Sequence, residues 1–348
     1  MDRKVLVAMS GGVDSSVAAL LLLRDGWNCA GATMHLLRDS ETDVTDARAV
    51  ADRLGMDFHV FPFADQFRVC VMDPFVRSYE KGDTPNPCIA CNRHLKFGSF
   101  LSEADKLGFS HIATGHYARV RFDAASGRWL LYKALDAGKD QSYVLYSLTQ
   151  QQLSRTLLPL GELTKAQARE LAAEHGFENA HRKDSQDICF VPDGDYVAFM
   201  ERYAGRSYAP GTFLDLNGNA VGMHRGAVRY TIGQRKGLGL AMGEPVYVCG
   251  KDMAQNTVTV GPNSALMRST LIASDCNWIS IPELSSPMRV QAKARYRHTE
   301  QPATLYAMED GRVRVVFDEP QRAMTPGQAV VFYDGDLVVG GGTIESVE

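Results

Sequence analysis

Three cysteines stand among polar residues and could carry thiol chemistry: Cys88, Cys91 and Cys189. Cys91 is followed by the basic stretch 93–96 at the expected start of a helix. A helix N-terminus and neighbouring cations both favour the thiolate form of cysteine. We therefore predict a nucleophilic thiol at Cys91. The other cysteines lie in apolar stretches and are interpreted as inert small hydrophobic residues: Cys29, Cys70, Cys249 and Cys276.

The spacing of Cys88 and Cys91, with two residues between them, has other interpretations. It is typical of half a zinc site or of a thioredoxin-like dithiol, or it arises by chance. The chain has no second pair of this spacing for a four-cysteine zinc site, and the pair does not open a thioredoxin-type βαβ unit. Cys189 alone is either reactive or a small hydrophobic residue, and Cys91 together with the glycine-containing loop described next favours a reactive thiol.

The second candidate site is the glycine-containing stretch from Ser10 to Ser16. It joins the apolar run 5–8, typical of a buried strand, to the run 17–23, typical of a helix. Such a turn presents backbone N–H groups and a helix dipole to an anion, and we expect the hydroxyl groups of Ser10, Ser15 and Ser16 to add donors. No lysine follows the glycines, so the loop is not a Walker A motif. An ordinary βα turn is the alternative.

Four apolar runs are predicted to form one parallel sheet: 5–8, 29–34, 58–61 and 111–118. Helices are predicted over 45–54 and over 163–175, the latter with Thr164 as its N-cap. This alternation predicts a doubly wound α/β domain with ligands at the C-terminal ends of the strands. Met34 at such an end either covers an adenine ring or belongs to the core, and His116 is either functional or structural.

Three domains are expected, over residues 1–202, 203–270 and 271–348. The central one is rich in glycine and proline, and its predicted strands are short: 228–232, 245–250 and 257–260. The last one has an all-β pattern that predicts a barrel, with turns at 309–311, 318–320 and 333–335.

Cationic side chains accumulate in the last two domains beside Tyr230 and Tyr296. One such charge is normally a solvated surface residue, but this number beside aromatic rings indicates a surface for a phosphate backbone. The residues are Arg225, Arg229, Arg235, Lys236, Arg268, Arg289, Lys293, Arg295, Arg297 and Arg322.

The composition is that of an ordinary globular protein. The 348 residues are 45% hydrophobic and 22% charged, with a net charge of −4. No apolar run approaches the roughly 20 residues that span a bilayer, and the first residues lead directly into a strand, so we expect no membrane association and no signal peptide. Seven scattered cysteines do not suggest a disulfide framework. We expect a cytoplasmic location.

Long motifs over essentially the whole chain resemble those of the tRNA-specific 2-thiouridylases. They are MSGGVDSSV, TPNPCIACN, ATGHYAR, KDQSYVLY, DSQDICFV, YTIGQRKGLG, KARYR and TPGQAVVFY. SGGVDSS also resembles the pyrophosphate-binding loop (PP-loop) of ATP pyrophosphatases. The resemblance implies an α/β domain like the adenine nucleotide alpha hydrolases, a small central domain and a C-terminal β-barrel, which together grip the anticodon arm of tRNA.

The resemblance also implies a reaction: ATP-dependent 2-thiolation of the wobble uridine in the tRNAs for Lys, Glu and Gln. The target base is turned out of its stack and its C2 oxygen is adenylated, with release of pyrophosphate. Sulfur from a persulfide then replaces that oxygen, and AMP leaves. The expected partners are the tRNA and a persulfide donor, either a cysteine desulfurase or a sulfur relay protein. We expect a monomer.

Residue by residue, the resemblance assigns the following roles. ATP would be bound by Ala8, Met9, Ser10, Gly11, Gly12, Val13, Asp14, Ser15, Met34 and Gly115, with Asp14 helping to hold Mg²⁺ on the pyrophosphate. The tRNA would be contacted by His116, Lys139, Asp140, Gln141, Arg295, Tyr296 and Gln328. Cys189 would carry the persulfide, and Cys91 would release the sulfur by forming a disulfide with Cys189.

Cys88 departs from the family pattern. Many members carry an aspartate there that is thought to act as general acid/base, so that role is unassigned in this chain. Cys88, Cys91 and Cys189 supply enough thiolates for a [4Fe–4S] cluster with one open iron, which related tRNA thiolation enzymes use. The persulfide route is favoured, and the cluster is its alternative.

Two other functional classes fit parts of the sequence. An amidotransferase-type synthetase would use the same loop, but no glutaminase half is recognisable and Cys189 would have no role. A tRNA-binding module that keeps the loop as a structural element would need neither Cys91 nor Cys189.

Overall fold

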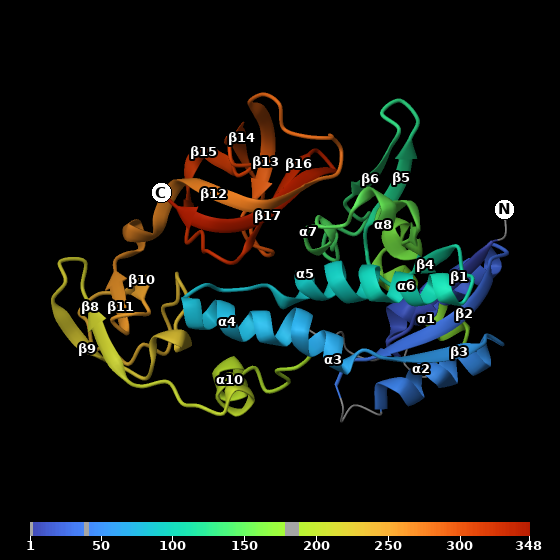
Figure 1. The fold of residues 1–348 in the computed structure, drawn as a ribbon, viewed down its shortest axis with the longest axis horizontal. Helices are drawn as coiled ribbons and strands as arrows, with labels where there is room; N and C mark the ends of the chain where they lie inside the picture. The colour runs from blue at the N-terminus through green and yellow to red at the C-terminus, as the bar shows by residue number, and fades with distance from the viewer. Residues whose placement is uncertain (1–2, 38–41, 178–187) are drawn as a thin grey trace.

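The computed structural model describes residues 3–37, 42–177 and 188–348. Its N-terminal domain is a parallel sheet with helices packed around it (Figure 1). The strand order β3-β2-β1-β4-β7 places the first strand in the middle. The strands are β1 (Lys4–Ala8), β2 (Asn28–His35), β3 (Phe58–Pro62), β4 (His111–Ala113) and β7 (Thr156–Leu157). The predicted α/β class is therefore confirmed.

Alternate side chains of β1 enter two separate cores. Leu6 packs on one face and Val5 and Val7 pack on the other. The Leu6 face is covered by α3 (Ala64–Phe67), η1 (Arg68–Met72), α4 (Asp73–Lys81) and α6 (Phe100–Lys106). The other face is covered by α1 (Val13–Arg24), α2 (Thr42–Arg53) and α9 (Lys165–Glu174). Burial on both faces is the reason that this strand is a continuous apolar run.

The CxxC pair lies at the start of a long helix that runs beside α4 (Figure 1). This helix consists of α5 (Pro87–Cys91), the π-helical η2 (Asn92–Ser99) and α6. The sequence placed its start at Arg93, which was wrong. Pro87 fits the first helical position, where its missing N–H is not needed, and the Asn86 side chain accepts the Cys88 N–H at 3.2 Å.

The rest of this domain contains a hairpin and short helices. Strand β4 is shorter than predicted and ends at Ala113, because the chain then turns across the start of α1. Strands β5 (Arg119–Asp123) and β6 (Arg128–Tyr132) form an antiparallel hairpin, which extends the barrel sheet. The helices are α7 (Ser142–Leu145), α8 (Gln150–Ser154), η3 (Pro159–Glu162) and α10 (Tyr196–Ala204). Thr164 caps α9 as predicted.

The central domain is a four-stranded sheet in the order β10-β11-β8-β9. Its strands are β8 (Gly211–Leu214), β9 (Ala220–His224), β10 (Tyr247–Asp252) and β11 (Thr257–Gly261). The strand predicted over 228–232 was wrong. A 3₁₀ turn, η5 (Ala227–Arg229), starts there after Gly226, whose φ of +107° few other residues adopt. Val228 and Tyr230 are apolar because both are buried.

The C-terminal domain is a β-barrel closed by pairing of its first and last strands, β12 and β17. Its elements are η6 (Asn263–Leu266), β12 (Met267–Trp278), β13 (Met288–Lys293), β14 (Gln301–Ala307), β15 (Val313–Arg322), β16 (Ala329–Asp334) and β17 (Leu337–Val347). The turns predicted at 309–311 and 333–335 join strands, but 318–320 lies inside β15, where the pairing with β12 is irregular. Among the described residues, no helix is long and apolar enough to cross a membrane.

Candidate active site

The turn between β1 and α1 has the geometry of an anion site. Gly11 has a φ of +69°, and Gly12 is the N-cap of α1 without a side-chain cap. The first backbone N–H groups of a twelve-residue helix and its dipole therefore face the turn. Ser10 is exposed at this position. The residues expected at the ATP phosphates thus form one loop at the end of the central strand.

Two of the three expected serine donors have internal partners. The hydroxyl groups of Ser15 and Ser16 each donate to the Gly12 carbonyl at 3.0 Å, and both residues are buried. The Ser15 oxygen also accepts the Ser10 N–H at 3.2 Å. Their hydroxyl groups therefore shape the loop, whereas sequence reasoning expected them to face the ligand.

Asp14 lies in the first turn of α1 and is held by two residues far away in the chain. The Lys165 ammonium lies 2.8 Å from both Asp14 carboxylate oxygens, and the Tyr117 hydroxyl donates to Asp14 Oδ1 at 2.8 Å. The Lys165 side chain is 9% exposed and the Asp14 side chain 32%. Lys165 was missed by the sequence reasoning, because a lysine that opens a helix resembles a surface residue.

Gly115 lies against the backbone of α1. A Cβ at this position would lie 2.7 Å from the Asp14 carbonyl carbon and 2.8 Å from the Ser15 nitrogen. Only glycine permits this approach. Met34 is partly buried at the end of β2. The proposed adenosine residues thus lie at the C-terminal edge of the sheet, as the topology predicted.

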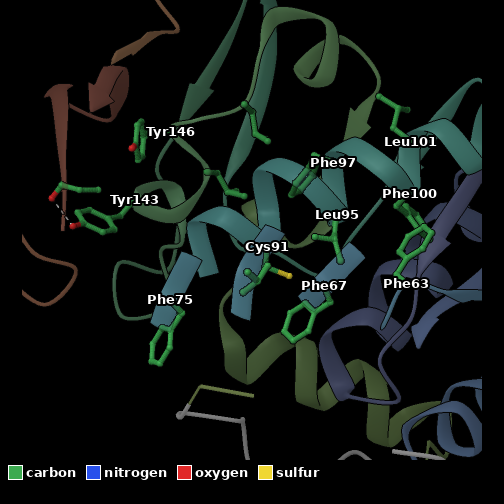
Figure 2. Packing of buried hydrophobic residues seen from close by; sticks show 14 of the residues in the cluster. Phe63, Phe67, Phe75, Cys91, Leu95, Phe97, Phe100, Leu101, Tyr143 and Tyr146 are labelled. Carbon is green, nitrogen blue, oxygen red and sulfur yellow. Dashed lines mark hydrogen bonds between the residues drawn. The ribbon is translucent and has the colours of Figure 1, made fainter. Parts of the chain in front are cut away.

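The cysteine site lies in the core that covers the Leu6 face of the sheet. Cys91 is buried, and its thiol points toward Phe67 and Leu95 (Figure 2). Cys88 and Cys189 are exposed residues. Of the motif around Cys189, residues 184–187 lie outside the described residues. Ile188 and Phe190, on either side of Cys189, pack in the same core as Cys91, so the fold brings the segment of Cys189 to the cysteine site.

The predicted thiolate at Cys91 is not favoured by its surroundings. Burial raises the pKa of the Cys91 thiol, Lys96 lowers this pKa, and Cys88 raises it. Arg93 does not help, because its guanidinium pairs with Asp275 of the barrel. The Cys189 residue is exposed to solvent, yet the protein packed around its thiol desolvates that group and raises its pKa to about 11, with Cys91 and Cys88 adding to the rise and Lys96 opposing it. In this conformation the Cys91 and Cys189 thiols are protonated at neutral pH.

The three cysteines do not fit a metal cluster as they are placed. Within the described ranges, no three His, Cys, Asp or Glu side chains are grouped to hold a metal ion. Asp14 fits a magnesium site better, because Mg²⁺ is commonly held by one or two carboxylates together with substrate phosphates.

The expected tRNA residues of the N-terminal domain lie in a tightly bonded loop. Asp140 accepts the Ala134 N–H at 3.0 Å and the Ser142 hydroxyl at 2.7 Å. Gln141 Oε1 accepts the Tyr117 N–H at 2.9 Å, which ties this loop to the Asp14 partner. Lys139 lies in the same loop and is partly buried. The side chains of Asp140 and Gln141 thus order the loop that is expected to meet RNA.

His116 is buried, and its Nδ1 lies 2.8 Å from the Thr114 hydroxyl oxygen. Burial, reinforced by Lys96, holds the pKa of His116 well below its ordinary value, so the ring is neutral. The centroid of its ring lies 5.7 Å from that of Phe97, which belongs to the long helix that carries Cys88 and Cys91 (the cysteine helix). In this conformation His116 is part of the packed interior, and its ring is not exposed to RNA.

The barrel residues expected to bind tRNA have different environments. Tyr296 is 41% exposed, its hydroxyl donates to the Asp140 carbonyl at 3.3 Å, and the Lys293 ammonium lies 5.8 Å from its ring. Arg295 is partly buried and donates to the Ile232 carbonyl and the Thr325 hydroxyl. The Gln328 amide donates to the carbonyl of Thr84 at 2.6 Å.

Only part of the predicted basic surface carries free charge. Arg229 pairs with Glu201 at 2.9 Å, and Arg289 pairs with Asp318 at 2.7 Å. Arg322 donates to Asn263 and to the Gly233 carbonyl. Five exposed basic side chains of the set remain for a phosphate backbone: Arg225, Arg235, Lys236, Arg268 and Arg297.

The fold and the loop define a nucleotide-binding α/β protein with a cluster of thiols and two β domains. A family model described as "tRNA methyl transferase HUP domain" matches residues 3–193. The models "tRNA methyl transferase PRC-barrel domain" and "Aminomethyltransferase beta-barrel domain" match residues 197–262 and 268–344.

Full-length relatives identify the family more closely. The tRNA-specific 2-thiouridylase MnmA of Acetivibrio thermocellus is 50% identical, with 99% of each chain covered. The protein of the same name from Moorella thermoacetica is 52% identical, with 98% of this chain and 99% of that one covered. The chain belongs to the tRNA-specific 2-thiouridylases, which are tRNA sulfurtransferase enzymes.

Among solved structures, the similarity is remote. A 4-thiouridine synthetase–RNA complex with bound ATP has a TM-score of 0.39 at 17% identity, covering 57% of this chain and 50% of that one. NMN synthetase from Francisella tularensis has a TM-score of 0.35 at 16% identity, covering 60% and 79%.

We predict that Gly115→Ala weakens ATP binding by about tenfold or more, because the added methyl group displaces the backbone of the first turn of α1. Equilibrium binding of a non-hydrolysable ATP analogue measures this effect. Gly108→Ala is a suitable control, because a Cβ there meets no atom within 4 Å, although its φ of +77° makes the change mildly destabilising. Unchanged affinity in Gly115→Ala would contradict the prediction.

We predict that alkylation of Cys189 in the free enzyme accelerates about tenfold per pH unit from pH 7 to pH 10, without a plateau, because its pKa is raised to about 11. Mass spectrometry of the Cys189 peptide after timed iodoacetamide treatment measures the rate. A plateau below pH 8 would show that the thiolate is favoured after all.

Proposed function

We propose that the chain catalyses ATP-dependent 2-thiolation of the wobble uridine of tRNA, with Cys189 as the persulfide carrier and Cys91 as the second catalytic thiol. The observation that carries this proposal is that Cys91 and the residues flanking Cys189 pack in one core, in the same domain as the phosphate-type loop. The family membership supports the substrate class.

The first step that we propose is activation of the base. The C2 oxygen of uracil attacks the α-phosphate of ATP, and pyrophosphate leaves. Residues Gly11 to Asp14 and the dipole of α1 are oriented to stabilise the charge on the departing pyrophosphate. Asp14 is the carboxylate that would hold Mg²⁺, which adds further charge stabilisation when bound.

Lys165 extends this site. It is paired with Asp14 in the free enzyme, so it stands at the position where phosphate charge and a metal ion would arrive. When Asp14 turns to the metal ion, the ammonium group becomes available to a phosphate oxygen. The ion pair thus keeps both charges compensated until the nucleotide binds.

The second step is sulfur transfer. The terminal sulfur of the Cys189 persulfide attacks C2, and AMP leaves with the former C2 oxygen. The Cys91 thiolate then attacks Cys189 Sγ, which forms a Cys91–Cys189 disulfide and releases the sulfur on the base. A two-electron reductant reopens the disulfide, and the sulfur donor renews the persulfide. The raised thiol pKa values mean that the free enzyme holds Cys91 unreactive until substrates bind.

We predict that Cys91→Ser and Cys189→Ser each abolish the 2-thio group, because each removes one sulfur of the exchange. Retardation of the tRNA on a mercury-containing gel, after expression in cells that lack the native activity, measures the product. Cys249→Ser is the matched control, because this half-buried cysteine lies in the central domain. Retained thiolation in either active-site variant would favour the RNA-binding alternative. Iron in the anaerobically purified enzyme would favour the cluster alternative.

We predict that Lys165→Met raises the KM for ATP by about tenfold or more, because it leaves the Asp14 carboxylate without its buried counter-charge and removes a phosphate partner. Pyrophosphate release in the presence of tRNA measures this constant. Lys106→Met provides the control, because Lys106 is exposed and paired only with Glu103 on its own helix. An unchanged KM in Lys165→Met would remove Lys165 from the ATP site.

A further inference from the structure

We propose that the barrel loop Pro326–Gln328 positions the cysteine helix, so that Gln328 acts as a positioning residue for Cys91 instead of an RNA contact. The inference rests on the proposed function only in its statement that Cys91 takes part in the reaction. The contacts themselves belong to the free protein.

The loop forms hydrogen bonds with the peptide groups on both sides of Thr84. The Thr84 N–H donates to the Pro326 carbonyl at 2.9 Å, and the Gln328 side-chain amide donates to the Thr84 carbonyl at 2.6 Å. The backbone of one residue is thus held at two points by a different domain. Side-chain amide contacts of this kind fix direction as well as distance.

The loop Pro326–Gln328 is itself hydrogen-bonded to strand β17 of the barrel. The Gly327 N–H donates to the Ile344 carbonyl at 2.9 Å, and the Ile344 N–H donates to the Gln328 carbonyl at 2.8 Å. Gly327 has a φ of +85°, and a Cβ there would lie 2.8 Å from Asp83 Cβ and 2.9 Å from the Thr84 nitrogen. The loop therefore requires glycine both for its own turn and for its approach to Thr84.

Thr84 is connected to the thiols by a stiff segment. Pro85 and Pro87 restrict the backbone that follows it, and the Asn86 side chain caps the Cys88 N–H. Cys88 lies in the first turn of α5 and Cys91 at its end. Displacement of Thr84 therefore moves the start of the helix that carries both cysteines.

Apolar packing joins the helix to the barrel deeper in the core, where Cys91 and Leu95 belong to one cluster with Ala329, but a cavity interrupts it near the helix start. A cavity of about 220 Å³ separates α4 and α5 from the barrel, and its lining includes Phe75, His94 and Gly327. Further along the helix, the Arg93 guanidinium makes a bidentate pair with the Asp275 carboxylate of the barrel, so a second contact holds the helix beyond its start. The hydrogen bonds to Thr84 hold the segment that leads into the helix.

The test uses Gln328→Glu in the full chain, because this change keeps the shape of the side chain and removes its donor. Hydrogen exchange of backbone amides in the peptide 83–91, measured without tRNA or ATP, is expected to accelerate roughly fivefold, the effect of one lost hydrogen bond. We expect kcat to fall, whereas the Kd for tRNA and the KM for ATP stay unchanged. Gln321→Glu is the control, because the Gln321 amide donates within the barrel to the Glu319 carbonyl.

Two results would overturn the proposal. Unchanged exchange together with a raised Kd for tRNA would make Gln328 an RNA contact, and unchanged exchange with full activity would leave it without either role. Gly327→Ala provides a second variant and is expected to accelerate the same exchange. If Cys91 has no part in the reaction, exchange still accelerates but kcat is unaffected, which separates failure of the proposed function from failure of this inference.

Discussion

The Asp14 carboxylate, paired with the buried Lys165 ammonium, is the group on which the nucleotide side of the structure depends. Its charge is compensated by Lys165 from α9 and by the Tyr117 hydroxyl from the segment after β4. Removing Asp14 would take this counter-charge from the Lys165 ammonium, whose side chain is only 9% exposed, and this costs more than a surface ion pair contributes. Three segments distant in the sequence are therefore held together around the turn that is shaped to receive an anion. The same carboxylate joins fold stability to ligand binding, because whatever displaces Lys165 must supply an equivalent positive charge.

Desolvation governs the thiol side in the same way. Cys91 lies in an apolar core with Phe67 and Leu95, and burial outweighs the helix start and the nearby cation that would otherwise favour a thiolate. Such a thiol is protected from oxidation between turnovers. The cost is that the free enzyme is not ready to react, so the approach of substrate or a change at the helix must complete the site.

The sequence revealed the elements whose signals are local. The apolar run before Ser10, the cap at Thr164 and the turn at 333–335 all have short-range causes, and each has its predicted place in the structure. Two of the errors have long-range causes, because the pKa of Cys91 depends on a core assembled from distant segments and the partner of Asp14 is 151 residues away. A pattern read along the chain contains no information on which of these groups will meet. The inward turn of the Ser15 and Ser16 hydroxyl groups has a local cause, because both donate to the nearby Gly12 carbonyl.

Lys96 connects these conclusions, because one cation acts on both thiols and on the buried histidine. It lowers the pKa of Cys91 and of Cys189 and helps to keep His116 neutral. The same ammonium group is thus placed to stabilise the thiolate of Cys91 or of Cys189 as each one forms, while it opposes a second positive charge on His116.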